Sequence, residues 1–380
     1  MNHWENYLSG LAGGLFSFTP PYILSHGLEK FLVKFLGALR LVHAKKTFDY
    51  AKVSLRTTIF IDEAKKRGMD VEVLHGPLDY LNYFRMWFKN RVYLFEGLPR
   101  APWLSGRVLE KIDDKMFVKK HLSRASFPVA EGKSFSWFSV ERACRYAKKI
   151  GFPVVVKPKH GSMSQHVTVN IQDEAALEYA IVSALRYAPS FIIERYISNA
   201  EVYRATVIDE YHIACIKRVP AHVTGDGVHT VAELVEIKNS DPSRGLPKAK
   251  DTTCYRIVID DTTYQLLTER GYTLSSVPEK GDRVWLQTKM ILDLGADLVE
   301  VTPQVHPDNA LLFRKIAELF HIKLVGIDFL AEDISKSWKK QNAVVLELNS
   351  MPYIDMHHFP TVGAPVNVAA RLCDLVQKYY

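Results

Sequence analysis

Cysteine is scarce in this sequence: the chain has four cysteines among 380 residues, and no two of them are close neighbours. Zinc and redox motifs need closely spaced pairs, so the cysteines predict neither kind of site. Disulfide frameworks are typical of small secreted domains, whereas a chain of this length can bury a hydrophobic core without one. We therefore expect a reducing, cytoplasmic compartment.

Long uninterrupted hydrophobic runs are also missing. The apolar stretch 11–24 contains Pro20-Pro21, whereas a membrane-spanning helix needs about 18 or more consecutive apolar residues. Glu5 precedes this stretch, where a signal peptide would carry basic residues. The stretch 31–42 mixes basic and apolar residues, which favours a helix packed on the body or on a second subunit over a membrane-surface helix. We expect no transmembrane segment, and a homodimer stays open.

Neither sign of charge is in large excess. Lys and Arg number 49 against 42 Asp and Glu, a net charge of +7 that suits an anionic ligand such as a nucleotide. Nothing in this balance favours nucleic acid as a partner. The composition, 47% hydrophobic and 24% charged, is typical of a folded protein. Because single cores stop growing at about 250–300 residues, we expect at least two domains.

Beyond residue 50 the hydrophobic pattern predicts a mixed α/β structure. Amphipathic spacing predicts helices over 56–67, 107–121, 140–150, 308–320 and 366–379, and one more capped by Asp173. Short apolar runs predict strands over 71–74, 92–95, 127–129, 152–158, 167–171, 191–194, 323–330 and 343–348. Residues 202–219 predict a hairpin that turns at Asp209-Glu210, and residues 220–305 are expected to be mainly loop.

Polar residues interrupt the two apolar strands near the end of the sequence. Asp328 follows Ile327, and Glu347 and Asn349 end the next strand. Because side chains alternate along a strand, Glu347 and Asn349 share a face, which Asp328 on a neighbouring strand can join. Their oxygen atoms suit Mg²⁺, with Mn²⁺ as an alternative. A buried hydrogen-bond network is the competing interpretation.

Two further groups of residues suggest a nucleotide site. Lys157 ends a buried strand before the small, polar loop 160–166, whose backbone N–H groups would approach a phosphate closely. An ordinary hairpin connection is the alternative. Residues 194–197 offer a strand edge to a purine, and Glu201 offers a carboxylate to ribose hydroxyls. Taken in isolation, this last group is equally a strand that ends in solvated charges.

The order and spacing of these residues resemble the ATP-grasp superfamily. The resemblance implies two phosphate lysines, a phosphate loop, an adenine hinge, a ribose carboxylate and a magnesium site. It assigns ATP binding to Lys115, Lys157, Gly161, Ser162, Ser164, Glu194, Arg195, Tyr196, Ile197 and Glu201, and magnesium to Asp328, Glu347 and Asn349.

Within that superfamily, roughly residues 110–380 resemble the ATP-grasp part of cyanophycin synthetase and of bifunctional glutathione synthetases. The similarity rests on the stretches 216–227, 305–307 and 356–365. Those enzymes are ATP-dependent carboxylate–amine ligases. The resemblance places Arg204 and Arg218 where the substrate carboxylate or the transferred phosphoryl group is held, and a guanidinium fork suits such oxyanions.

The chain also departs from these relatives. Residues 164–166 replace a glycine-richer phosphate loop, and residues 290–296 and 350–355 differ beside the acceptor. The amino-acid substrates of the relatives therefore do not transfer to this chain. The sequence has no Walker-type loop of a second ligase domain, so polymerisation is not expected. Packing or supporting roles, not metal binding, are favoured for His306, His357 and His358.

The sequence thus predicts an α/β (α+β) protein with the ATP-grasp fold, in which two α+β subdomains clamp ATP. A divergent pre-ATP-grasp region, 1–106, precedes an ATP-grasp domain, 107–380, with a lid subdomain at about 125–196 and a C-terminal subdomain at about 197–380. The expected activity joins a small carboxylate to an amine, such as amino acids or peptides, through an acyl phosphate. An ATP-grasp phosphotransferase or kinase, and a degenerate scaffold, stay open.

Overall fold

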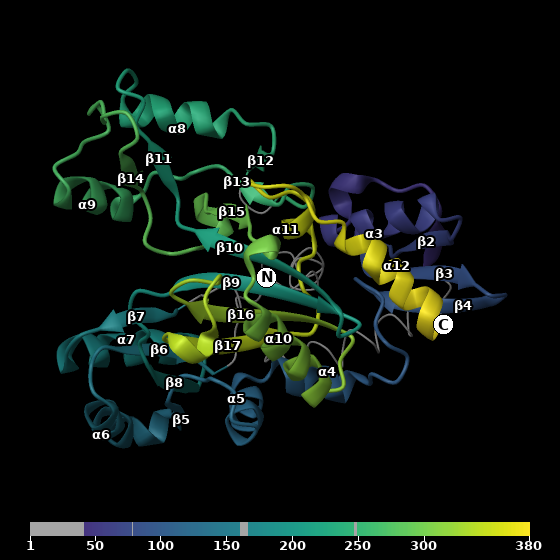
Figure 1. The fold of residues 1–380 in the computed structure, drawn as a ribbon, viewed down its shortest axis with the longest axis horizontal. Helices are drawn as coiled ribbons and strands as arrows, with labels where there is room; N and C mark the ends of the chain where they lie inside the picture. The colour runs from purple at the N-terminus through teal and green to yellow at the C-terminus, as the bar shows by residue number, and fades with distance from the viewer. Residues whose placement is uncertain (1–41, 78, 160–165, 247–248) are drawn as a thin grey trace. The chain divides into compact units, whose positions relative to one another are not determined.

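The computed structural model describes residues 42–77, 79–159, 166–246 and 249–380. The predictions for 11–24 and 31–41, and those for Gly161, Ser162 and Ser164, fall outside the described residues. The chain divides into two compact units (Figure 1). The first consists of the residues up to Pro102 together with Leu372–Tyr380, and the second is Trp103–Arg371. The subdomain limits drawn from the sequence stay predictions.

The first unit is an antiparallel sheet with one long helix. Its strands β1 (His43–Lys45), β2 (Asp70–His75), β3 (Tyr80–Phe88) and β4 (Arg91–Glu96) are paired in sequence order. The short helix η1 (Tyr50–Lys52) precedes α3 (Leu55–Lys66), and the end of α12 (Val368–Tyr379) belongs to this unit. The predictions for α3, β2 and β4 are confirmed, whereas β3 was not predicted.

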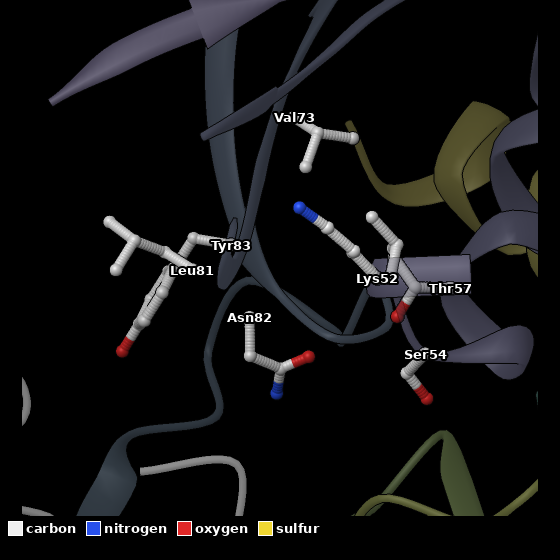
Figure 2. A pocket seen from close by; sticks show the side chains of 8 residues that line it. Lys52, Ser54, Thr57, Val73, Leu81, Asn82 and Tyr83 are labelled. Atoms are coloured by element: carbon white, nitrogen blue, oxygen red, sulfur yellow. The ribbon is translucent and has the colours of Figure 1, made fainter. Parts of the chain in front are cut away.

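A pocket lies in the first unit (Figure 2). Its lining comes from residues 52–54, Thr57, Val73 and 81–83. Thr57 is buried, and its hydroxyl donates to the carbonyl oxygen of Gly97 at 2.9 Å. Among the described residues, none of those predicted to bind ATP or metal lines this pocket, so it is not part of the candidate site.

One layer of the second unit is a four-stranded antiparallel sheet with two helices (Figure 1). Its order is β5 (Gly132–Ser136), β8 (Ser190–Arg195), β6 (Val154–Pro158) and β7 (Thr168–Ile171). η2 (Trp137–Ser139) leads into α6 (Val140–Ile150), and α7 (Glu174–Tyr187) follows β7. Leu177, Ala180, Ile181 and Ala184 of α7 are buried in the core against β6 and β8, as their helical spacing predicts.

A five-stranded antiparallel sheet forms the centre of the second unit. Its order is β15 (Asp297–Glu300), β10 (His212–Val219), β9 (Glu201–Ile208), β16 (Leu324–Ala331) and β17 (Ala343–Asn349). α10 (Pro307–Leu319) covers one face, where Phe313 packs against Phe329. The predicted hairpin is confirmed, and Asp209 and Glu210 adopt positive φ at its turn. The opposite face of the sheet, which α10 does not cover and which is called the free face below, carries the residues predicted to bind metal.

Most described residues of the predicted loop region 220–305 do lie outside helices and strands, but the region contains several elements that were not predicted. This part contains β11 (His222–Thr224), α8 (Val231–Asn239), α9 (Asp261–Glu269) and β14 (Arg283–Trp285) around a small core of their own. The same region also contains the shorter elements β12 (Arg244–Gly245), β13 (Cys254–Tyr255) and η3 (Leu292–Leu294). Most of these elements are too short to show a clear period. For α8, the capping box of Thr230 and Glu233 and the spacing of Val231, Leu234 and Val235 were usable signals that the sequence reasoning missed.

Two predictions before residue 130 were wrong. The single helix expected over 107–121 is divided into α4 (Gly106–Asp113) and α5 (Lys115–Arg124) by Asp114, whose carboxylate accepts from the N–H groups of Met116 and Phe117. This N-cap starts a new helix at Lys115. The strand expected over 127–129 is only an isolated bridge from Val129 to Val345.

The remaining short elements are η4 (Thr302–Gln304), η5 (Trp338–Lys340) and α11 (Asp355–His358). Asn309 anchors the segment before η5, because its Nδ2 donates to the carbonyl oxygens of Ile334 and Lys336 at 2.8 and 2.9 Å. No helix in the described part of the chain is long and apolar enough to cross a membrane.

Candidate functional site

Asp328 stands at the centre of the free face of the five-stranded sheet. It is opposite Arg204 on β9 and opposite Glu347 on β17. The register of β17 shifts next to this position, so that Leu346 is the extra residue and Glu347 faces the same way as Asp328. Asn349 shares that face two residues on. The structure therefore brings together the three residues predicted to bind metal, whose role stays a prediction.

Arg204 and Asp328 form a buried ion pair with two hydrogen bonds. Nη2 of Arg204 donates to Oδ2 of Asp328 at 3.0 Å, and Nε donates to Oδ1. Burial raises the pKa of the Asp328 carboxyl, but the charges of Arg204 and Arg218 outweigh it and lower this pKa to about 2. Both groups are therefore charged at neutral pH, and the pair fixes the guanidinium in place.

Three buried N–H donors near this pair have no hydrogen-bond partner among the described residues: Nη1 of Arg204, Nε of Arg218 and Nδ2 of Asn349. Arg218 lies on β10 opposite Val202, which is two residues before Arg204 on the same face. Burial lowers the pKa of Arg218 despite the nearby carboxylate of Asp328. Because buried donors without acceptors are costly, a bound oxyanion would stabilise this arrangement.

A second buried cluster lies on the neighbouring strands β6 and β8, where Glu194 holds two lysines. Its Oε2 is 2.8 Å from Nζ of Lys157, and its Oε1 is 2.5 Å from Nζ of Lys119. Burial raises the pKa of Glu194, but the two ammonium groups outweigh it and lower this pKa to about 2. Burial also lowers the pKa of Lys119. The cluster carries a net charge of +1, which suits a neighbouring phosphate.

Gly132 makes the position of Glu194 possible. It is opposite Glu194 in the pairing of β5 with β8, and a Cβ atom there would lie 2.6 Å from Cγ of Glu194. Any larger residue would push the carboxylate away from its lysines. The sequence contained no periodic signal for this contact, because it depends on the register of two strands about 60 residues apart.

Lys115 and Lys119 start on the same face of α5 but contact different groups. Lys115, predicted as the first phosphate lysine, has its Nζ 3.5 Å from Oε2 of Glu347. Lys119 reaches Glu194 and also donates to the carbonyl oxygen of Ala130 at 2.8 Å. Lys119 was missed by the sequence reasoning, although its i+4 spacing from Lys115 was a usable signal.

The predicted adenine hinge follows β8 directly. The N–H of Arg195 donates to the carbonyl oxygen of Glu131 at 2.9 Å, and the N–H of Tyr196 donates to that of Pro153 at 3.1 Å. A purine at this edge would therefore meet other backbone groups, such as those of Ile197. Glu201 begins β9, and its Oε1 is 2.9 Å from Nζ of Lys217.

Comparisons with known proteins show the family and the fold of this chain. A family model described as the carbamoyl-phosphate synthase L chain, ATP binding domain, matches residues 114–272. Cyanophycin synthetase of Nostoc sp. is 35% identical over 264 residues, which are 69% of this chain and 29% of that protein. The crystal structure of a bifunctional glutathione synthetase from Pasteurella multocida has a TM-score of 0.68 at 24% identity, covering 87% of this chain and 45% of that one. This chain is a member of the ATP-grasp superfamily.

A second relative extends the matched region of this ATP-grasp chain. The glutathione biosynthesis bifunctional protein GshAB of Mannheimia succiniciproducens is 30% identical over 335 residues, which are 84% of this chain and 42% of that protein. The chain thus spans less than half the length of the relatives it matches. The predicted superfamily and fold are confirmed, and the substrates of the whole relatives do not follow from these matches.

The donor set on the free face of the ATP-grasp sheet fits a divalent cation. Glu347 is partly exposed, and Asn349 supplies an amide oxygen next to it. Asp328 already accepts two hydrogen bonds from Arg204, but a carboxylate has about four lone-pair sites and can serve a cation as well. Hard oxygen ligands of this kind are what Mg²⁺ binds, usually with water and phosphate oxygens completing its shell.

Proposed function

We propose that this chain is an ATP-dependent carboxylate–amine ligase that forms an amide bond through an acyl phosphate. The observation that carries the proposal is the free face of the five-stranded sheet. There the buried guanidinium of Arg204, fixed by Asp328, and the nearby Arg218 each present an N–H donor, Nη1 and Nε, that has no partner among the described residues, and the side-chain oxygens of Glu347 and Asn349 share this face. Such a face suits a phosphoryl group in transfer and the oxyanion that follows.

ATP would bind between this face and the Glu194 cluster. Lys157 and Lys119 would neutralise phosphate oxygens while Glu194 holds both lysines in position, and Lys115 would act from the start of α5. The hinge Glu194–Ile197 would meet the adenine and Glu201 the ribose. The loop with Gly161, Ser162 and Ser164 would supply N–H groups to the phosphates.

The reaction needs two displacements. An oxygen of the substrate carboxylate attacks the γ-phosphorus of ATP, the bond from that phosphorus to the β–γ bridging oxygen breaks, and ADP leaves. The amine nitrogen then attacks the acyl carbon, the carbon–oxygen bond to phosphate breaks, and the nitrogen loses a proton. Arg204 and Arg218 would hold the acyl phosphate and then the tetrahedral oxyanion. Mg²⁺, held by Asp328, Glu347 and Asn349, would neutralise charge on the transferring phosphate.

The substrates would be a small carboxylate and a small amine, such as amino acids or peptides, because the relatives are named for cyanophycin and glutathione. We place the enzyme in the cytoplasm, in line with the four free cysteines. The test is ADP release from purified protein, Mg²⁺ and ATP against a library of amino-acid and dipeptide pairs. ADP release coupled to amide formation supports the ligase, and a stable phosphorylated product without amide would show a phosphotransferase.

Glu347→Gln is expected to raise the Mg²⁺ concentration needed for half-maximal ADP release about tenfold, because an amide replaces a charged oxygen ligand. The fold should be unaffected, since Glu347 is only partly buried. A magnesium titration of activity, with a melting curve, checks both statements. Glu332→Gln, an exposed change just after β16, is the control. An unchanged magnesium requirement would remove Glu347 from the metal site.

A further inference from the structure

His357 is a fully buried histidine whose two ring nitrogens both contact polar side chains. Its exposed fraction is 0%, and it lies in α11. Nε2 is 2.8 Å from Oγ1 of Thr206, and Nδ1 is 3.4 Å from Oε2 of Glu300. Since Glu300 accepts hydrogen bonds, we assign Nδ1–H as the donor to Glu300 and the Thr206 hydroxyl as the donor to Nε2.

Glu300 is itself held firmly. It is buried at the end of β15, and its Oε1 accepts from the backbone N–H of Thr302 at 2.8 Å and from the Thr302 hydroxyl. The Thr302 hydroxyl oxygen in turn accepts from the N–H of Cys215 on β10 at 2.8 Å. His357 is therefore tied to three strands of the central sheet, through Thr206 on β9 and through Glu300 to β15 and β10.

The segment that His357 anchors, 350–361, follows Asn349 immediately. At its start, the N–H and hydroxyl of Ser350 donate to the carboxylate of Asp113 at 2.9 and 2.8 Å. At its end, the hydroxyl of Thr361 donates to the carbonyl oxygen of Leu298 at 2.9 Å. His357 supplies an attachment to the sheet between these two ends.

Segment 350–361 passes over the free face of the sheet at the position where His357 contacts Thr206. Thr206 is two residues from Arg204 on the same face of β9, and it is opposite Gly326 on β16. A Cβ atom at Gly326 would lie 3.0 Å from Cβ of Pro352 and 3.3 Å from Nη1 of Arg204. Pro352 and this Nη1, which has no hydrogen-bond partner among the described residues and which the proposed function uses, therefore border the same space above Gly326.

We propose that His357 is a positioning residue: through Thr206 and Glu300 it holds segment 350–361 against the sheet, so that Pro352 confines the guanidinium of Arg204. The effect on turnover rests on the proposed function, whereas the attachment of the segment does not. Loss of the Thr206 contact would loosen the segment and let Arg204 move, which lowers turnover. ATP affinity would not change, because the Glu194 cluster is not touched.

Thr206→Val tests this directly, because valine keeps the volume and removes the hydroxyl. We expect turnover with the substrate pair found in the library to fall about tenfold, with the ATP dissociation constant within twofold of wild type. Amide hydrogen exchange measured by mass spectrometry should become faster in peptides covering 350–366. Thr206→Ser keeps the hydroxyl and is the matched control, expected within twofold of wild type in all three measurements.

Two changes at His357 separate its contacts and do not depend on how Thr206→Val folds. His357→Gln keeps a polar group at the Nε2 position and should retain most of the activity. His357→Asn keeps only the Nδ1 position and should behave like Thr206→Val. The proposal would be overturned if amide hydrogen exchange in Thr206→Val were as slow as in wild type. It would also be overturned if ATP affinity fell in parallel with turnover. If no substrate pair is found, the proposed function fails, and the exchange measurement alone decides the attachment.

Discussion

Glu194→Gln is expected to destabilise the second unit by about 3–5 kcal/mol, because removing one partner of a buried ion pair leaves buried charge uncompensated. Both carboxylate oxygens of Glu194 face ammonium groups, and the amide nitrogen of glutamine would face one of them. Burial already lowers the pKa of Lys119, and the change would remove the carboxylate charge that counteracts this lowering. A melting curve at pH 7 should show a fall of roughly 10 °C. ATP binding should weaken as well, since the phosphate lysines lose their support.

Glu131→Gln is the matched control for this change. Glu131 pairs with Arg195 at 3.1 Å near the same strand, but both side chains are about half exposed. Such surface pairs contribute less than about 1 kcal/mol. If Glu194→Gln had the same melting temperature as Glu131→Gln, the buried cluster would not stabilise the fold as described.

The difference in stability between wild type and Glu194→Gln is expected to depend on pH. The folded-state pKa of Glu194, about 2, is below its ordinary value of 4.5, so its stabilisation is present above pH 4.5 and is lost as the pH falls toward 2. The difference in melting temperature between wild type and Glu194→Gln should therefore be largest at neutral pH and shrink below pH 4.5. Melting curves measured at pH 7, 5, 4 and 3 check this, and a constant difference would contradict it.

Arg218→Lys is expected to lower turnover about 10²-fold or more while ATP affinity stays nearly unchanged. Lysine keeps the charge but loses the planar fork and the buried Nε that has no partner among the described residues. Removing one oxyanion donor costs this much in other enzymes. Comparing the maximal rate with the ATP dissociation constant from calorimetry separates an effect on the transition state from one on nucleotide binding.

Arg270→Lys, on the exposed turn after α9, controls for the chemical change itself. It should match wild type in both measurements. Wild-type turnover in Arg218→Lys would exclude Arg218 from the chemistry. An equal loss of turnover and ATP affinity would instead move Arg218 to the nucleotide site.

Much of the central sheet could be predicted because its signals are local. The apolar runs of β9, β10, β16 and β17 are long, and the alternation that places Glu347 and Asn349 on one face needs no tertiary information. The pairing of Asp328 with Arg204 could not be predicted in the same way. It depends on which strands become neighbours and on a register shift that adds Leu346.

The failures have physical causes of the same kind. Lys119 has the sequence neighbourhood of an ordinary surface lysine, and only the approach of β8 to α5 buries it beside Glu194. The region 220–305 is stabilised by a core drawn from many short elements, together with buried contacts such as Arg244 and Lys238 to Asp297. The i+4 spacing places Lys119 on the same face of α5 as Lys115, but its burial and the contacts to Asp297 depend on tertiary packing that a single sequence does not display.

The most direct test of the central claim follows one oxygen atom. Wild-type protein is given ATP, Mg²⁺, the amine and a carboxylate substrate whose two carboxylate oxygens are ¹⁸O, and the released phosphate is analysed by mass spectrometry. Because the attacking carboxylate oxygen stays on phosphorus when the amine displaces phosphate, the account predicts one ¹⁸O in each phosphate released per amide formed. Unlabelled phosphate formed together with amide would contradict the acyl phosphate and the ligase mechanism built on it.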